Sequence, residues 1–215
     1  MSVRHTLLAL VIIVIWGVNF VIIDDALGDM PPLALLALRA VVIVFPAILF
    51  FPRPRMDWRW LALIGVLLGF GQPVFLYIAL ALGFPPGLAS LLLQTQMIFT
   101  ILMAAILLRE RPTRRQVLGV ALGMGGLAIV IAAHGVAAPL IPLLIALGSA
   151  ISWALGNVAV RSANVDAGLS IVVWSGLVVP IPTFLLSLAI ETPAVVFDSF
   201  AHITPSVVFA TLFSA

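Results

Sequence analysis

The stretch "TLLALVIIVIWGVNFVII" (residues 6–23) lies near the start of the chain and is apolar almost throughout. A transmembrane helix needs about 20 consecutive apolar residues, and this run approaches that length. Asn19 is the polar residue in its interior, and hydrocarbon offers its carboxamide no hydrogen-bond partner. The run therefore predicts a membrane-spanning helix whose Asn19 side chain faces other parts of the protein. Because no small-residue cleavage site follows the run, we expect it to remain as a span.

The composition extends this prediction to the whole chain. Hydrophobic residues make up 64% of the 215 residues, charged residues make up 8%, and the mean hydropathy is +1.31. A soluble domain carries about 25% charged residues, so this chain could not cover itself with a water-compatible surface. Its apolar runs are continuous rather than alternating, which predicts an all-α polytopic membrane protein. The eight expected hydrophobic segments are Thr6–Ile23, Leu33–Phe51, Trp60–Leu82, Gly87–Leu108, Val117–Ala133, Leu140–Val160, Leu169–Ile190 and a start at Pro205.

Charge alternates between successive connections. Nine of the ten arginines lie beside the first segment or in three connections, at Arg4, in "PRPRMDWR" (52–59), in "RERPTRR" (109–115) and at Arg161. The other connections hold no arginine and five of the eight acidic residues. The positive-inside rule then places the N-terminus and the arginine-bearing connections in the cytoplasm. The net charge of +2 is interpreted as this topology signal, and no nucleic-acid partner is expected.

The sequence repeats internally. "IWGVNF" (15–20) recurs as "SWALGNV" (152–158), where Trp and Gly again precede Asn. The segments that follow agree at a constant offset of 136, which pairs Leu33 with Leu169, Arg39 with Ser175 and Pro46 with Pro182. These matches predict a first repeat of five helices over residues 1–135 and a second repeat that begins at 136–215. An odd number of spans in a repeat inverts the next one, and inverted repeats are typical of secondary transporters. Because 11 residues from Pro205 to Ala215 are too few to span a bilayer, we expect the second repeat to be truncated after about two and a half spans.

Arg39 is the charged residue within a confident span. An arginine at mid-helix costs roughly 2.5 to 3.5 kcal/mol even on the lenient insertion scale, so it needs an internal partner or water. It could line a cavity and hold a carboxylate, or it could be structural and reach toward the nearby helix end. Both interpretations stay open.

Two asparagines each share a helical face with a tryptophan, Asn19 with Trp16 and Asn157 with Trp153. They could contact a substrate at a repeat interface, or they could only hydrogen-bond neighbouring helices. Gln94 and Gln96 would lie about 200° apart on one helix, so one could line a path while the other packs. Gln72 precedes Pro73, a bend is expected there, and Tyr77 follows by about one and a half turns. The candidate cavity-lining residues are Trp16, Asn19, Arg39, Gln72, Tyr77, Gln94, Gln96, Trp153 and Asn157.

The chain resembles the EamA-type transporters of the drug/metabolite transporter superfamily. "WGVNFV" (16–21), residues 30–50, residues 85–130 and "ISWALGNV" (151–158) carry the resemblance. It is most similar to the amino-acid metabolite branch, typified by exporters of cysteine and O-acetylserine. The resemblance implies ten spans in two inverted five-helix repeats and alternating access without ATP. Asp24 stands where relatives commonly carry a basic residue, so the resemblance does not fix which substrate charge this chain prefers.

These observations favour a secondary exporter of amino acids or related small polar metabolites in the bacterial cytoplasmic membrane. A non-transporting fragment or scaffold, and an exporter of another substrate class, remain alternatives. An enzyme is not expected, because the segments hold no Gly-x-Ser-x-Gly, no histidine and no paired acids. No cofactor or metal is expected, and the chain has no cysteine. The expected partners are a small-molecule substrate and the lipid bilayer, and "GVLLG" (65–69) and "GVALG" (119–123) indicate close packing within the protein or in a homodimer.

Overall fold

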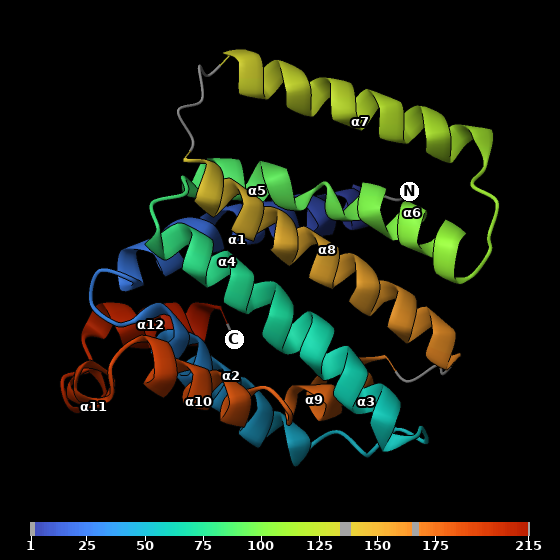
Figure 1. Ribbon diagram of the computed structural model, residues 1–215. Coiled ribbons are helices and arrows are strands. Elements are labelled where there is room, and N and C mark those ends of the chain that lie inside the picture. Colours follow the sequence, from blue (N-terminus) through green and yellow to red (C-terminus); the bar gives the residue numbers. More distant parts are fainter. Residues whose placement is uncertain (1–2, 134–138, 165–167, 215) are drawn as a thin grey trace.

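The computed structural model describes residues 3–133, 139–164 and 168–214, and it places nearly all of them in helices (Figure 1). No strand occurs in these ranges, so the predicted all-α class is confirmed. The expected boundary between 135 and 136 lies outside the described residues. The helices are α1 (Val3–Ala26), α2 (Pro32–Ile48), α3 (Trp58–Ile64), η1 (Gly65–Gly71), α4 (Gln72–Ala81), α5 (Pro86–Leu93), α6 (Gln96–Leu107), α7 (Arg114–Ala133), α8 (Leu140–Ala163), α9 (Leu169–Gly176), α10 (Pro180–Ile190), α11 (Pro193–Ala201) and α12 (Pro205–Phe213).

The helices are long and apolar enough for a membrane protein. In the described part of the chain, four stretches have the length and hydropathy to cross a bilayer, and up to six do if each bent pair forms one span. The four are His5–Ala26, Trp58–Ala81, Pro86–Leu107 and Leu140–Ala163. The prediction of a polytopic membrane protein is confirmed.

The bundle is organised around α8, which packs against α4, η1 and α6, and around α2, which packs against α4, α9, α10 and α12. Helix α7 lies at the margin, along the upper edge of Figure 1. Among the α7 side chains whose exposure is described, only Val120 and Leu127 are partly buried. The core therefore joins helices from the two halves of the sequence, and α7 contributes little to it.

The segment Trp58–Ala81 changes its helical hydrogen-bonding pattern just before Pro73. Helix η1, directly before it, is a π-helix in which the Gln72 N–H donates to the Leu67 carbonyl, five residues back. Proline has no N–H for the helical hydrogen-bond ladder, and single π-helical turns often mark such interruptions. Helix α8 contacts this π-helical segment, because Ser149 donates to the Gln72 carbonyl at 2.7 Å and Ser152 donates to the Leu67 carbonyl at 2.7 Å.

Two segments predicted as single helices are broken. The span Gly87–Leu108 is interrupted between α5 and α6, where the Thr95 hydroxyl donates to the Leu92 carbonyl at 2.6 Å and competes with the helical ladder. The span Leu169–Ile190 divides into α9 and α10, which meet at 43°. Pro180 begins α10, and its missing N–H together with its fixed φ ends the preceding helix.

The connection predicted over residues 191–204 is wrong in part, because it contains helix α11. Pro193 opens this helix, and Val196 is completely buried. Helices α11 and α12 meet at 92°, which is the geometry of a broken span or a re-entrant loop. A nine-residue helix is too short to show clear apolar periodicity, so the sequence pattern was not sufficient to reveal it.

The two small-residue patterns behave differently. A Cβ atom added at Gly65 would overlap the Ser175 carbonyl oxygen, and one at Gly69 would lie 2.5 Å from a Val179 methyl carbon. The predicted close packing is therefore confirmed for "GVLLG". A Cβ at Gly119 or Gly123 would meet no atom within 4 Å, so "GVALG" is not packed within this chain.

Candidate functional site

Arg39 lies on α2, which is packed between α4, α10 and α12, and its side chain is partly buried. Its Nε and Nη2 atoms both donate to the carbonyl oxygen of Ser214, at 2.9 and 2.7 Å. Two hydrogen bonds to a neutral oxygen satisfy part of the guanidinium but do not neutralise its charge. Within the described residues no carboxylate pairs with Arg39, and an internal cation of this kind is a candidate for binding an anion.

Two further polar side chains line the same small cavity as Arg39. Tyr77 comes from α4 and is 1% exposed, and Thr211 comes from α12 and is 4% exposed. The Tyr77 hydroxyl and the Thr211 hydroxyl are both buried without a hydrogen-bond partner. Ile23, Leu35, Ala210 and Ser214 complete the lining of this narrow cavity, which is too small to hold a water molecule. We call Arg39, Tyr77 and Thr211 the Arg39 cluster.

The sequence analysis named Arg39 and Tyr77 but not Thr211. The structure brings the first two together from helices about 40 residues apart, because α2 and α4 pack side by side. Thr211 lies in a segment that was interpreted only as the start of a span. A hydroxyl residue in an apolar segment is a weak signal, since it can hydrogen-bond within its own helix.

Trp16 and Trp153 meet across the bundle. Their ring centroids lie 6.1 Å apart and the ring planes are inclined by 81°, which is an edge-to-face contact. Asn19, one turn beyond Trp16, is partly buried and its Oδ1 atom has no hydrogen-bond partner. Asn157, one turn beyond Trp153, is also partly buried. Helices α1 and α8 run in opposite directions in Figure 1, so the two asparagines diverge from the tryptophan contact.

The predicted glutamines do not gather at one place. Gln72 is buried, and its backbone carbonyl receives the Ser149 hydroxyl. Gln94 is exposed and lines a second cavity of about 300 Å³. Gln96 is partly buried and lines neither cavity. The helix break after Gln94 changes the angle between Gln94 and Gln96 from the value for a continuous helix.

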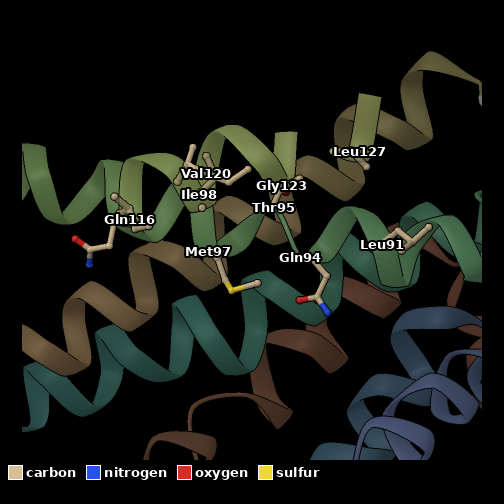
Figure 2. A pocket seen from close by; sticks show the side chains of 11 residues that line it. Leu91, Gln94, Thr95, Met97, Ile98, Gln116, Val120, Gly123 and Leu127 are labelled. Atoms are coloured by element: carbon tan, nitrogen blue, oxygen red, sulfur yellow. The ribbon is translucent and has the colours of Figure 1, made fainter. Parts of the chain in front are cut away.

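The second cavity lies between α7 and the helices α5 and α6. Figure 2 shows Gln94 and Gln116 well separated along it, with mainly apolar side chains between them. Gly119 and Gly123, the open small-residue face of α7, form part of its wall. The cavity therefore follows from the loose packing of α7.

Acidic residues join the two halves of the chain at one end of the bundle. Glu191 accepts hydrogen bonds from the backbone N–H groups of Leu33 and Ala34 at the start of α2, at 2.6 and 3.1 Å. Two nearby carboxylates also accept hydrogen bonds from the other half of the chain. Ser206 donates to Asp25 at 2.8 Å, and Thr204 donates to Asp29 at 2.7 Å. We call these contacts the acidic clasp. The sequence analysis assigned these acids to connections and did not predict their partners.

An ion pair lies among the arginine-bearing connections. Arg161, in the last turn of α8, contacts Glu110 at 2.8 Å. Both side chains are at least 40% exposed, so this pair contributes little to stability. Within the described residues, no three histidine, aspartate or glutamate side chains are grouped to hold a metal ion.

A bundle of apolar, broken helices with unpaired polar groups inside it defines a multi-pass membrane protein. Residues 4–132 match the EamA-like transporter family, and the chain belongs to that family. The protein is therefore a membrane transporter and not an enzyme. No solved structure matches the chain.

Curated relatives agree with this assignment. The chain is 36% identical to the "Probable amino-acid metabolite efflux pump" of Escherichia coli strain K12, over 100% of the chain and 74% of that relative. It is 37% identical to the protein of the same name from Salmonella typhimurium strain LT2, with the same coverage. An "Uncharacterized transporter YvbV" of Bacillus subtilis strain 168 is 30% identical over 74% of the chain and 54% of that relative. The resemblance to the amino-acid metabolite branch is confirmed.

Proposed function

We propose that this transporter exports amino acids or related small polar metabolites across the bacterial cytoplasmic membrane by alternating access. The observation that carries the proposal is the Arg39 cluster, a guanidinium and two buried, unpaired hydroxyls inside an apolar bundle. Polar groups without partners are rare inside proteins, and in transporters they are typical of substrate paths. The printed name of the two relatives at 36 and 37% identity supports the substrate class.

Two features support an alternating-access cycle. The acidic clasp holds the end of α1 and the start of α2 against the segment from Glu191 to Ser206. The hydrogen bonds of Asp25 and Asp29 are exposed, so water can replace them at little cost, whereas those of Glu191 are partly buried. Helices broken at Thr95 and Pro180 supply the bends about which packed segments can move. In the proposed cycle, the acidic clasp opens in the state whose substrate path is open to the side of the membrane on which the clasp lies.

We further propose that residues 1–135 and 136–215 belong to two inverted repeats. The opposite directions of α1 and α8 in Figure 1 support this arrangement, as does the contact between the equivalent residues Trp16 and Trp153. The arginine-bearing connections support a cytoplasmic N-terminus. The open small-residue face of α7, at Gly119 and Gly123, supports a homodimer contact as a secondary proposal.

Uptake into everted membrane vesicles tests the proposed function, because export from the cell becomes accumulation inside such vesicles. Vesicles that contain the protein are energised and offered each of a set of radiolabelled amino acids. Accumulation of at least one amino acid above that in vesicles without the protein supports the proposal. If every amino acid gives the same counts in both preparations, amino-acid export is wrong.

A further inference from the structure

The second cavity is an apolar space that opens at the outside of the bundle. Helix α7 forms one wall and α5 and α6 form the other, where Met97 is 60% exposed (Figure 2). None of the described residues that line it is charged. Of its polar side chains, Thr95 donates to the Leu92 carbonyl, and Gln116 accepts the Thr113 N–H at 2.8 Å. In a bilayer this space would border on hydrocarbon.

Arg115 stands at one end of the second cavity. Its neighbours on α7 are Gln116, the next residue, and Gly119, one turn later, and both line the cavity. Side chains on a helix lean toward its N-terminus, which in α7 is the end that follows the connection from α6. The Arg115 side chain therefore extends from the end of the cavity toward that connection.

The connection between α6 and α7 brings further positive charge to the same end. The four arginines of this connection and the first turn of α7 are all exposed, and they are Arg109, Arg111, Arg114 and Arg115. Glu110 is the acid of the connection, and it pairs with Arg161 of α8. Within the described residues, no carboxylate pairs with any of the four arginines. This end of the cavity therefore carries positive charge without a matching anion.

The cavity is about as long as one leaflet of a bilayer is thick. Gln116 and Leu127 mark its two ends on α7, and they lie about 16 Å apart along the helix axis at about 1.5 Å per residue. One leaflet contributes half of a hydrocarbon core that is about 30 Å thick. An extended apolar chain that lies in the cavity from Leu127 onward would thus end beside the arginines.

We infer that the second cavity binds one acyl chain of an anionic phospholipid whose phosphate lies against the arginines at the start of α7. Arginine binds phosphate oxygens through two parallel hydrogen bonds, and clustered basic residues beside a span attract anionic headgroups. In the orientation proposed above, the lipid belongs to the cytoplasmic leaflet. The inference goes beyond the proposed function, because it assigns a ligand that is not transported.

Charge favours a lipid over a second copy of this chain as the occupant of the cavity. A parallel second copy packed against α7 would bring its own four arginines to the same end, where like charges repel. An anionic headgroup supplies the missing negative charge instead. A zwitterionic headgroup supplies less, because its ammonium group is repelled by the arginines.

Matched lipids test the inference on the full chain purified in detergent. Phosphatidylglycerol and phosphatidylethanolamine with identical acyl chains are titrated separately, and native mass spectrometry counts the bound lipid and reports the oligomeric state. Phosphatidylglycerol should bind at least about tenfold more tightly, since each arginine near an anionic headgroup contributes about fivefold. Glycerol phosphate, which has the headgroup charge but no acyl chain, should compete poorly, because it leaves the apolar cavity empty.

A glycine substitution tests the position of the acyl chain. A Cβ at Gly123 would meet no atom within 4 Å, so Gly123→Leu should project into the cavity and weaken phosphatidylglycerol binding about tenfold, because each displaced CH₂ is worth about fourfold. Gly125→Leu is the matched control. Gly125 is equally open but lies about 200° around α7 from Gly123 and does not line the cavity.

An arginine substitution tests the position of the headgroup. Arg115→Gln should weaken phosphatidylglycerol binding about fivefold and leave phosphatidylethanolamine binding unchanged. Arg55→Gln is the matched control, since Arg55 is also exposed but precedes α3, which lies at the opposite margin of the bundle from α7 in Figure 1. The control should bind both lipids like the unchanged chain.

The inference is supported if Gly123→Leu and Arg115→Gln weaken phosphatidylglycerol binding and their controls do not. It is overturned if the two lipids bind equally, if glycerol phosphate competes as well as the intact lipid, or if each control loses as much as its partner. A dimer that binds no phosphatidylglycerol and that Gly123→Leu dissociates would also overturn it and give this face to a second copy. None of these outcomes depends on the transported solute, so a failure here leaves the proposed export untouched.

Discussion

The Glu191 carboxylate closes the first turn of α2 by accepting the Leu33 N–H at 2.6 Å, across 158 positions of sequence. A second oxygen of the same carboxylate accepts the Ala34 N–H and the Ser187 hydroxyl. The first N–H groups of a helix have no partner within the helix, and a negative charge there is further stabilised by the helix dipole. Glu191 therefore connects the end of α10 to the start of α2.

Replacing Glu191 with Ala should lower the free energy of unfolding by about 1 to 2 kcal/mol, because the variant loses this helix cap. Unfolding of the purified protein in mixed detergent micelles measures the change. Asp198→Ala is the control, since Asp198 lies on α11 in the same part of the chain but its side chain is 76% exposed and its ion pair is with His202 alone. Equal stability of the two variants would contradict the capping role.

Alanine at two glycines should have opposite effects. Gly65→Ala should lower the free energy of unfolding by about 1 to 3 kcal/mol, because its Cβ would collide with the Ser175 backbone, which cannot easily move. Gly119→Ala should leave stability unchanged or raise it by up to about 1 kcal/mol, since alanine favours the helix and the site is open. The same unfolding assay compares the two. A destabilised Gly119→Ala protein would indicate that α7 is packed more closely than described.

Serine hydroxyls on α8 should stabilise the packing of α8 against the π-helical segment before Pro73. Ser149→Ala and Ser152→Ala each remove a hydrogen bond to a backbone carbonyl of the facing segment, at Gln72 and Leu67. Such contacts between membrane helices contribute roughly 0.6 to 2 kcal/mol, so each variant should lose that much. Ser162→Ala is the control, because its hydroxyl bonds the Val158 carbonyl of its own helix. If all three variants unfold alike, the contacts between helices do not stabilise this packing.

The spans could be predicted from sequence because the requirement for a long apolar run is local. The run at 6–23 and that at 140–160 lie within α1 and α8. The bend expected near Pro73 stays a prediction. The break at Thr95 was not predicted, because threonine bends a helix only when its hydroxyl takes a backbone carbonyl. Composition predicts which segments lie in the membrane, but it does not predict where a helix is interrupted.

The candidate site was predicted less completely than the spans. Arg39 was found because a charge in a membrane span is costly and therefore informative. Thr211 and Glu191 were missed, since neither residue type is unusual in its segment and their importance depends on helices far away in sequence. Nothing local in the sequence marks a contact that spans 158 positions.

Cysteine labelling should reveal the orientation that the arginines predict. The chain has no native cysteine, so single introduced cysteines can be assigned without ambiguity. Pro52→Cys lies exposed among the arginine-bearing connections, and Asp198→Cys lies exposed on α11. A membrane-impermeant maleimide should label Asp198→Cys in intact spheroplasts and Pro52→Cys only in everted vesicles. The reverse pattern would place the N-terminus outside the cytoplasm.

The contact between Trp16 and Trp153 should be detected by cross-linking and by energetic coupling. With cysteines at both positions, a short bifunctional maleimide should join α1 to α8, because the two ring centroids lie 6.1 Å apart. A Trp16→Cys, Trp174→Cys pair is the control, since Trp174 lies on α9 and its indole N–H donates to the Phe51 carbonyl at 2.9 Å.

In a double-mutant cycle of Trp16→Ala and Trp153→Ala, the coupling free energy should be about 0.5 to 1.5 kcal/mol, as for other edge-to-face aromatic pairs. Because Trp16 is 53% exposed, the loss in each single variant should be smaller than for a fully buried tryptophan. Efficient cross-linking of the control pair, or additive losses in the cycle, would refute a direct contact between the two equivalent tryptophans.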